Sequence, residues 1–452
     1  MRSKLAIYVA IGLVAAVALV AGVVAVAGAG SSTSLSAVSA SELMGRMGQS
    51  QGQVQAVSGE VSWKNDLFGD LGSATDMAQL PAQSPLTSSG SGRIWVSDAG
   101  VRVESQGAGG DQVAGVSKAT RTAWTYDSAT NTVRRLVMAG DAPANEPIPS
   151  PSASMMTPAA IGAYLQQLAP YATVDVAGQG TVAGRAVYLL RMTPVADDTA
   201  LGAVQASIDG KTMMPLRLEV FAKSGGAAVL QFGFDSVSYG PIDAALYDFT
   251  PPAGTTVTTK TIDLGQAAKS HQGEPTKAQQ EQMQSAVRGA LLTIPEAQKL
   301  VPFQLASAQG YTARPFDWAA VVSKSGPLNA LDQPVMKLLG AAGMSGFGSA
   351  TDGTATSATS TTNPTGPTAV LLYGKGFGTI ALAETATTPA LQKQIEQLPA
   401  LLEVYHGQFA GTARSLTTPL GGAIIWQQGD TTLVAAGMVP KANLLAFVSS
   451  VR

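Results

Sequence analysis

The 452-residue chain contains no cysteine, which excludes disulfide bonds, thiolate metal sites, thiol catalysis and a lipid-modified N-terminal cysteine. It has only two histidines, His271 and His406, and neither has partners at the spacing of a metal or catalytic site. Signatures of P-loops, zinc proteases, serine hydrolases and EF-hands are also missing. The formal net charge of -2 argues against nucleic-acid binding. We therefore predict a protein that is not an enzyme and has no metal or cofactor.

Hydrophobic residues, in contrast, make up 45% of the chain. The first apolar stretch, Leu5 to Ala27, follows Arg2 and Lys4 and contains no charge. A helix of this length crosses roughly 30 Å of hydrocarbon, and the positive flank places its N-terminus in the cytoplasm. The alternative is a signal peptide cleaved near Ala27, whose apolar core is ordinarily about 7–15 residues long. Residues 1–30 are thus predicted to be a single-pass transmembrane helix or a signal peptide, with the remainder extracytoplasmic.

Residues 31–262 are predicted to form one sheet-rich domain. A short helix is expected near "ELMGRMGQS", with Ser41 as its cap. From Val54 onward apolar and polar residues alternate with a period of two, and the runs are separated by turn residues such as Asp98-Ala99-Gly100 and Asp209-Gly210. Consecutive strands at hairpin distances favour an antiparallel sheet over βαβ units.

Residues 263–292 are Gln-rich and amphipathic, which predicts a linker helix. Residues 293–452 are then predicted to form a smaller C-terminal α+β domain. Within it, residues 340–368 form a low-complexity loop with few large apolar side chains. The glycine-rich "GKGFG" at Gly374–Gly378 resembles a phosphate loop only superficially, because no Ser or Thr and no helix follows it, so a hairpin turn is predicted.

Several predicted strands are apolar on both faces, although a sheet with one wet face would alternate. Ile94-Trp95-Val96 and Leu230, Phe232 and Phe234 are examples. Two interpretations stay open: both faces pack against protein, or one face is concave and holds an acyl chain. The candidate lining residues are Val61, Trp63, Ile94, Val96, Trp124, Tyr126, Leu189, Leu218, Val220, Phe232 and Phe234.

From about Ser41 to Val257, the order of these segments resembles the periplasmic lipoprotein-carrier superfamily, the LolA/RseB/LppX group. The similar segments are the leading helix, "VSGEVSW", "GRIWVSDAGVRVE", the Asp209–Leu218 hairpin with Pro215, and "FTPPAGTTV" at Phe249–Val257. The resemblance implies an α+β fold in which a curved antiparallel sheet, a half-barrel, encloses helices and an apolar cavity. The C-terminal "GGAIIWQQGDTTLVAAGM" more weakly resembles a DUF4367-like domain.

This resemblance implies an extracytoplasmic, membrane-anchored protein that binds lipid or lipoprotein acyl chains for envelope transport. Its partners would be those acyl chains and the cytoplasmic membrane. The alternative that the resemblance implies is an RseB-like envelope-stress regulator, which would contact an anti-sigma factor or another envelope protein.

Overall fold

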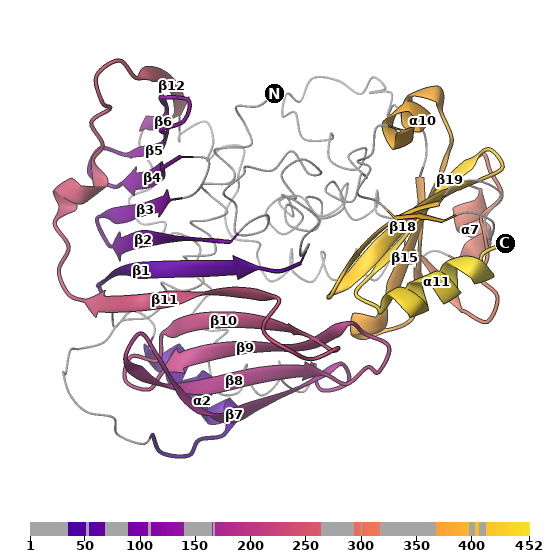
Figure 1. Cartoon of the computed structure of the whole chain (residues 1–452), viewed down its shortest axis with the longest axis horizontal. Helices are drawn as coiled ribbons and strands as arrows, with labels where there is room; N and C mark the ends of the chain where they lie inside the picture. Colours follow the sequence, from indigo (N-terminus) through magenta and orange to yellow (C-terminus); the bar gives the residue numbers. More distant parts are fainter. Residues whose placement is uncertain are drawn as a thin grey trace.

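The computed structural model of the chain describes residues 35–50, 54–67, 89–106, 110–139, 165, 168–263, 293–299, 301–316, 368–396, 403–405 and 413–452. It contains two β-sheets, a large one and a smaller one (Figure 1). The predicted N-terminal membrane segment, the linker helix at 263–292 and the loop at 340–368 lie outside the described residues, apart from Asp263 and Thr368. No helix within the described ranges is long and apolar enough to cross a membrane.

The large sheet is open and curved and has twelve strands in the order β12-β6-β5-β4-β3-β2-β1-β11-β10-β9-β8-β7 (Figure 1). Every neighbouring pair is antiparallel except β12 and β6, which run parallel. The predicted curved antiparallel sheet is thus confirmed, with one parallel pair at its edge. The strands are β1 (Ala56–Asn65), β2 (Gly90–Ser97), β3 (Gly100–Gln106), β4 (Gln112–Ser117), β5 (Thr122–Asp127), β6 (Thr132–Ala139), β7 (Ala172–Val182), β8 (Arg185–Pro194), β9 (Leu201–Asp209), β10 (Pro215–Ala222), β11 (Leu230–Tyr239) and β12 (Thr256–Asp263).

Tight turns join neighbouring strands at the positions that the sequence predicts. The β2–β3 turn is Asp98-Ala99, between the paired residues Ser97 and Gly100. Between β5 and β6, the Asp127 carboxylate accepts a hydrogen bond from the Thr130 amide at 3.0 Å, and Asn131 adopts a φ of 45°. Asp and Asn are suited to such turns because their side chains bond to nearby backbone and tolerate the left-handed conformation.

Four register shifts interrupt the pairing of the large sheet, and two of them lie at Phe221/Ala222 in the β10–β9 pair and at Val176/Gly178 in the β7–β8 pair. The third lies between Glu60 and Val61, where β1 pairs with β11, and the fourth lies between Pro215 and Arg217, where β10 pairs with β9. An extra residue in one strand of a pair bends that strand and exchanges which side chains face each side. A large buried cluster lies near the last two shifts; its members are Val57, Val61, Ile94, Val103, Val182, Val187, Met214, Leu216 and Phe234.

Helix α2 (Ala40–Ser50) packs against β7, β8 and β9, at the end of the large sheet opposite β12. Leu43 of the helix is buried with Tyr188 and Ile208. The predicted cap was wrong by two residues: the Ser39 hydroxyl, not that of Ser41, accepts a hydrogen bond from the Glu42 amide at 3.1 Å. The helix begins at Ala40, so Ser41 already lies within its first turn.

A segment that we call the strap, Asp243–Thr255, crosses one face of β3 to β6. It contains the 3-10 helix η2 (Ala244–Tyr247). The Phe249 ring stacks on Trp124 with centroids 4.3 Å apart, and the Trp124 indole N–H donates to the Tyr247 carbonyl at 3.0 Å. Gly254 then turns with a φ of +78° and leads into edge strand β12, as the Pro-Pro-x-Gly sequence predicted.

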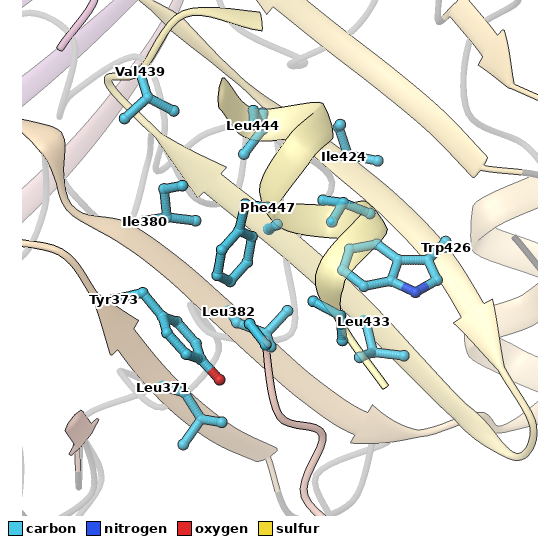
Figure 2. Close-up of a cluster of buried hydrophobic side chains, with 14 of the residues drawn as sticks. Leu371, Tyr373, Ile380, Leu382, Ile424, Trp426, Leu433, Val439, Leu444 and Phe447 are labelled. Atoms are coloured by element: carbon cyan, nitrogen blue, oxygen red, sulfur yellow. The ribbon is translucent and has the colours of Figure 1, made fainter. Parts of the chain in front are cut away.

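The smaller sheet has seven antiparallel strands in the order β13-β14-β15-β19-β18-β17-β16. Helix α11 (Lys441–Ser450) covers one face, and Phe447 and Leu444 insert between Tyr373, Leu382 and Ile424 (Figure 2). The other elements are α7 (Ile294–Gln298), β13 (Ala313–Phe316), β14 (Thr368–Tyr373), η5 (Gly376–Gly378), β15 (Ile380–Ala386), α10 (Pro389–Glu396), β16 (Glu403–Tyr405), β17 (Ala413–Thr418), β18 (Gly421–Gln428) and β19 (Thr431–Gly437).

The two sheets meet at a joint in which the glycine-rich loop takes part. The Met438 carbonyl accepts hydrogen bonds from the Ala200 amide at 2.7 Å and from the Thr199 hydroxyl at 2.9 Å. A Cβ on Gly376 would lie 2.8 Å from the Tyr171 ring, which is closer than real Cβ contacts allow. "GKGFG" is therefore the predicted turn between β14 and β15, and its small residues let the large sheet approach.

We expect Gly376→Ala to loosen this joint, because the new methyl group would collide with Tyr171. Small-angle X-ray scattering should show a larger radius of gyration than for the wild type. Gly429→Ala is the matched control, since Gly429 has a similar φ of +59° but has open space around it. The expectation fails if both variants scatter like the wild type.

Candidate functional site: an apolar face on the large sheet

One face of six neighbouring strands carries two continuous rows of apolar side chains. Residues paired across neighbouring strands point to the same side of a sheet, so the register identifies the rows directly. We call this set the apolar face. Its first row is Val174, Met192, Val204, Val220 and Leu230, and its second is Val176, Leu190, Ala206, Leu218, Phe232 and Trp63.

The reverse side of the same strands is polar. Between the two apolar rows, the reverse side carries Asp175, Arg191, Gln205, Glu219, Gln231 and Lys64. Arg191 donates to the Gln205 side-chain oxygen at 3.3 Å, and the Gln205 amide donates to Glu219 at 3.2 Å. Over these three rows, apolar and polar side chains therefore alternate along each strand.

The two apolar rows are more exposed than stability alone favours. Leu218 on the apolar face is 48% exposed, whereas Gln205 on the polar side is only 9% exposed. Apart from the buried Trp63, the other members of the apolar face are partly exposed. A contiguous, partly exposed apolar surface is the usual mark of a binding site.

Helix α2 covers only one end of the apolar face. Its cluster includes Val176, Leu190 and Ala206 from the second row. Leu218 and Phe232 continue that row beyond the residues that pack with α2. Helix α2 therefore borders the apolar face at its β7–β9 end.

The predicted lining residues fall into three environments. Trp63, Leu218, Val220 and Phe232 belong to the apolar face. The buried cluster holds Val61, Ile94 and Phe234, with Val96, Leu189 and also Phe232 packed against it.

Trp124 and Tyr126 lie on the opposite side of β5 from the side that continues Ile94, and they face the strap. The structure therefore does not bring the predicted residues into a single lining. Sequence reasoning missed Met192, Val204 and Leu230, although their alternation with polar neighbours was a usable signal.

Two buried carboxylates lie elsewhere. Asp209 pairs with Arg185 and accepts hydrogen bonds from the Tyr239 hydroxyl at 3.2 Å and the Lys211 amide at 2.8 Å. Burial raises the pKa of Tyr239 to about 12, so it remains a neutral donor. This carboxylate is fully engaged in closing the β9–β10 turn, which is a structural role.

Glu384 of the smaller sheet is different. It lies on the same side of β15 as the core residue Leu382, and one of its oxygens accepts from the Ala306 amide at 2.9 Å. The other oxygen has no hydrogen-bond partner within the described chain. Burial raises the pKa of this carboxyl to about 7.

Metal chemistry finds no support in the geometry of the described ranges. Among them, no three His, Asp or Glu side chains lie together as a potential metal site. His271 and His406 lie outside the described residues.

The sequence matches no protein-family model and no curated protein. Among solved structures, the chain is similar to one of the Pseudomonas aeruginosa MucA/MucB complex, with 15% identity, a TM-score of 0.37, and coverage of 91% of this chain and 98% of that chain. It is also similar to a LolA superfamily protein from Nitrosomonas europaea, with 9% identity, a TM-score of 0.18, and coverage of 47% of this chain and 99% of that chain.

An uncharacterized conserved protein from Thermus thermophilus is a third similar structure, with 11% identity, a TM-score of 0.28, and coverage of 49% of this chain and 99% of that chain. One of these structures is thus of a LolA superfamily protein, the group that the sequence resembles. The DUF4367-like character of the C-terminal part remains a prediction.

Proposed function

We propose that the large sheet binds the acyl chains of a lipid or lipoprotein on its apolar face, outside the cytoplasmic membrane. The observation that carries this proposal is the pair of continuous apolar rows that is left partly exposed. With strands about 4.8 Å apart, six strands offer a stripe roughly 24 Å long. Burying each methylene is worth about 0.8 kcal/mol, so a long chain binds without charged groups.

The test is to place a charge on each side of the same strand pair. Leu218→Glu puts a carboxylate among hydrocarbon, which is costly, and we expect retention of a fluorescent fatty acid to fall at least about tenfold. Gln231→Glu adds the same charge to the polar side beside Lys64 and should bind as the wild type does. Mass spectrometry of lipid that copurifies from native membranes provides a second readout.

Equal lipid binding by both variants, with unchanged circular dichroism, would remove the apolar face as the site. Absence of any copurified or added lipid on the wild-type protein would reject the proposed function itself.

A second candidate function is regulation of an anti-sigma factor or another envelope protein through protein contact. It is favoured by the joint, because Ala200 directly precedes strand β9 of the apolar face and is hydrogen-bonded to Met438 of the smaller sheet. Through these hydrogen bonds, ligand binding on the apolar face can change the position of the smaller sheet. Capture of a membrane partner that is lost in Gly376→Ala but kept in Gly429→Ala would support this function.

A further inference from the structure

The indole N–H of Trp63 is an unused hydrogen-bond donor at one end of the apolar face. Trp63 is only 6% exposed, and its Nε1 atom is buried with no acceptor in the part of the chain that the structure describes. Trp124 in the same sheet shows the usual arrangement, in which the buried indole N–H donates to a carbonyl. Leaving such a donor unpaired costs stability, so it requires an explanation.

The surroundings of Trp63 hold its ring in place. Trp63 pairs with Phe232 on one side and with Gly90 on the other. The ring lies over Gly90, because a Cβ at that glycine would be 2.6 Å from the ring. The ring orientation is therefore fixed before any ligand arrives. Because the Nε1 atom is itself buried, a ligand carbonyl reaches it by displacing what covers it and not by turning the side chain.

The chemistry of the neighbours selects the class of acceptor. Phe232 and Leu218 continue the row from Trp63, and neither side chain can accept a hydrogen bond. A ligand with an apolar chain and one carbonyl oxygen at its end matches this row, in which two apolar side chains are followed by one N–H donor. Esters and amides of fatty acids have this form, whereas plain hydrocarbon does not.

We propose that Trp63 is a specificity-determining residue, whose indole N–H donates to the ester or amide carbonyl of an acyl chain on the apolar face. This inference rests on the proposed function and adds the chemical class of the ligand. It places the carbonyl end of the chain at β1 and the methyl end towards α2.

The test uses the full chain and two probes, a pyrene-labelled decanoate methyl ester and a pyrene-labelled alkane of matched length. The wild type should prefer the ester about five- to tenfold, which is the worth of one hydrogen bond. Trp63→Phe keeps an aromatic ring but lacks the donor, so it should lose the preference and bind the ester and the alkane equally well. Trp95→Phe, the same change on the opposite side of the sheet, should retain the preference.

A measurement on the wild type guards against misfolding of the variant. The ¹H–¹⁵N signal of the Trp63 indole, assigned by its absence in Trp63→Phe or by site-specific labelling, should shift downfield with the ester and not with the alkane. Equal binding of both probes by the wild type, or an ester preference that survives in Trp63→Phe, overturns the role of Trp63 and leaves acyl binding intact. Binding of neither probe overturns both proposals.

Discussion

Trp124→Ala is expected to lower the free energy of unfolding of the large sheet by about 3–5 kcal/mol, as is typical when a buried tryptophan is truncated. The change removes the stacking on Phe249 and the hydrogen bond to the Tyr247 carbonyl. It also opens a cavity beneath the strap, where Tyr247 is fully buried. Chemical denaturation followed by circular dichroism would measure the loss.

Trp124→Phe is the matched control, because it keeps an aromatic ring against Phe249 and removes only the N–H donor. We expect about 1–3 kcal/mol of destabilisation from the unpaired Tyr247 carbonyl. If Trp124→Ala is no less stable than Trp124→Phe, the strap does not hold the sheet in the way that the contacts indicate.

Glu384→Gln is expected to remove a pH dependence from the stability of the smaller domain. Burial raises the pKa of Glu384 from its ordinary 4.5 to about 7, so the folded state holds the proton more tightly than the unfolded state does. Stability is therefore greatest below about pH 4.5, falls as the pH rises towards 7, and stays lower above that. The total loss is about 3 kcal/mol for this group.

The neighbouring Tyr373 does not titrate in this window, because its pKa is raised to about 12, chiefly by burial. Glu384→Gln should thus be more stable than the wild type at pH 8 and similar to it at pH 4.5, as measured by thermal unfolding across pH. The control is Glu60→Gln, the same substitution at a side chain that is 57% exposed. A wild-type profile that is flat from pH 5 to 8 would contradict the assignment.

The sequence predicts the strands of the large sheet well because their alternation and turn residues are local signals. The β2–β3 and β5–β6 turns lie where Asp98-Ala99 and Asp127–Asn131 indicate. The edge strand β12 after Pro251-Pro252 was also readable, because Gly254 turns the chain into it, but β11 already ends at Tyr239, well before the prolines.

The face that each strand presents was not readable from the sequence. Four register shifts, among them those at Glu60/Val61 and at Pro215/Arg217, exchange the sides of their strands, and the alternation alone does not show between which residues they fall. Ile94 and Trp124, both apolar and β-forming, were placed in one predicted lining although they lie on opposite sides, because their relative side depends on the registers of the three strand pairs between β2 and β5. The strap was missed because its contacts join residues more than 100 positions apart, such as Trp124 and Tyr247.

The order of strands in the large sheet also determines the order in which it can assemble. β1 to β6 form one run of consecutive hairpins and β7 to β11 form another, so most pairings are local in the chain. Only β1 with β11 and β6 with β12 join distant segments, and such contacts form slowly because they must close long loops. During synthesis β1 is made early, and its partner β11 follows about 170 residues later in the chain. Until β11 and then β12 are made, β1 and β6 are unpaired edge strands of the first run. The nascent protein is therefore most vulnerable to wrong strand pairing during this interval.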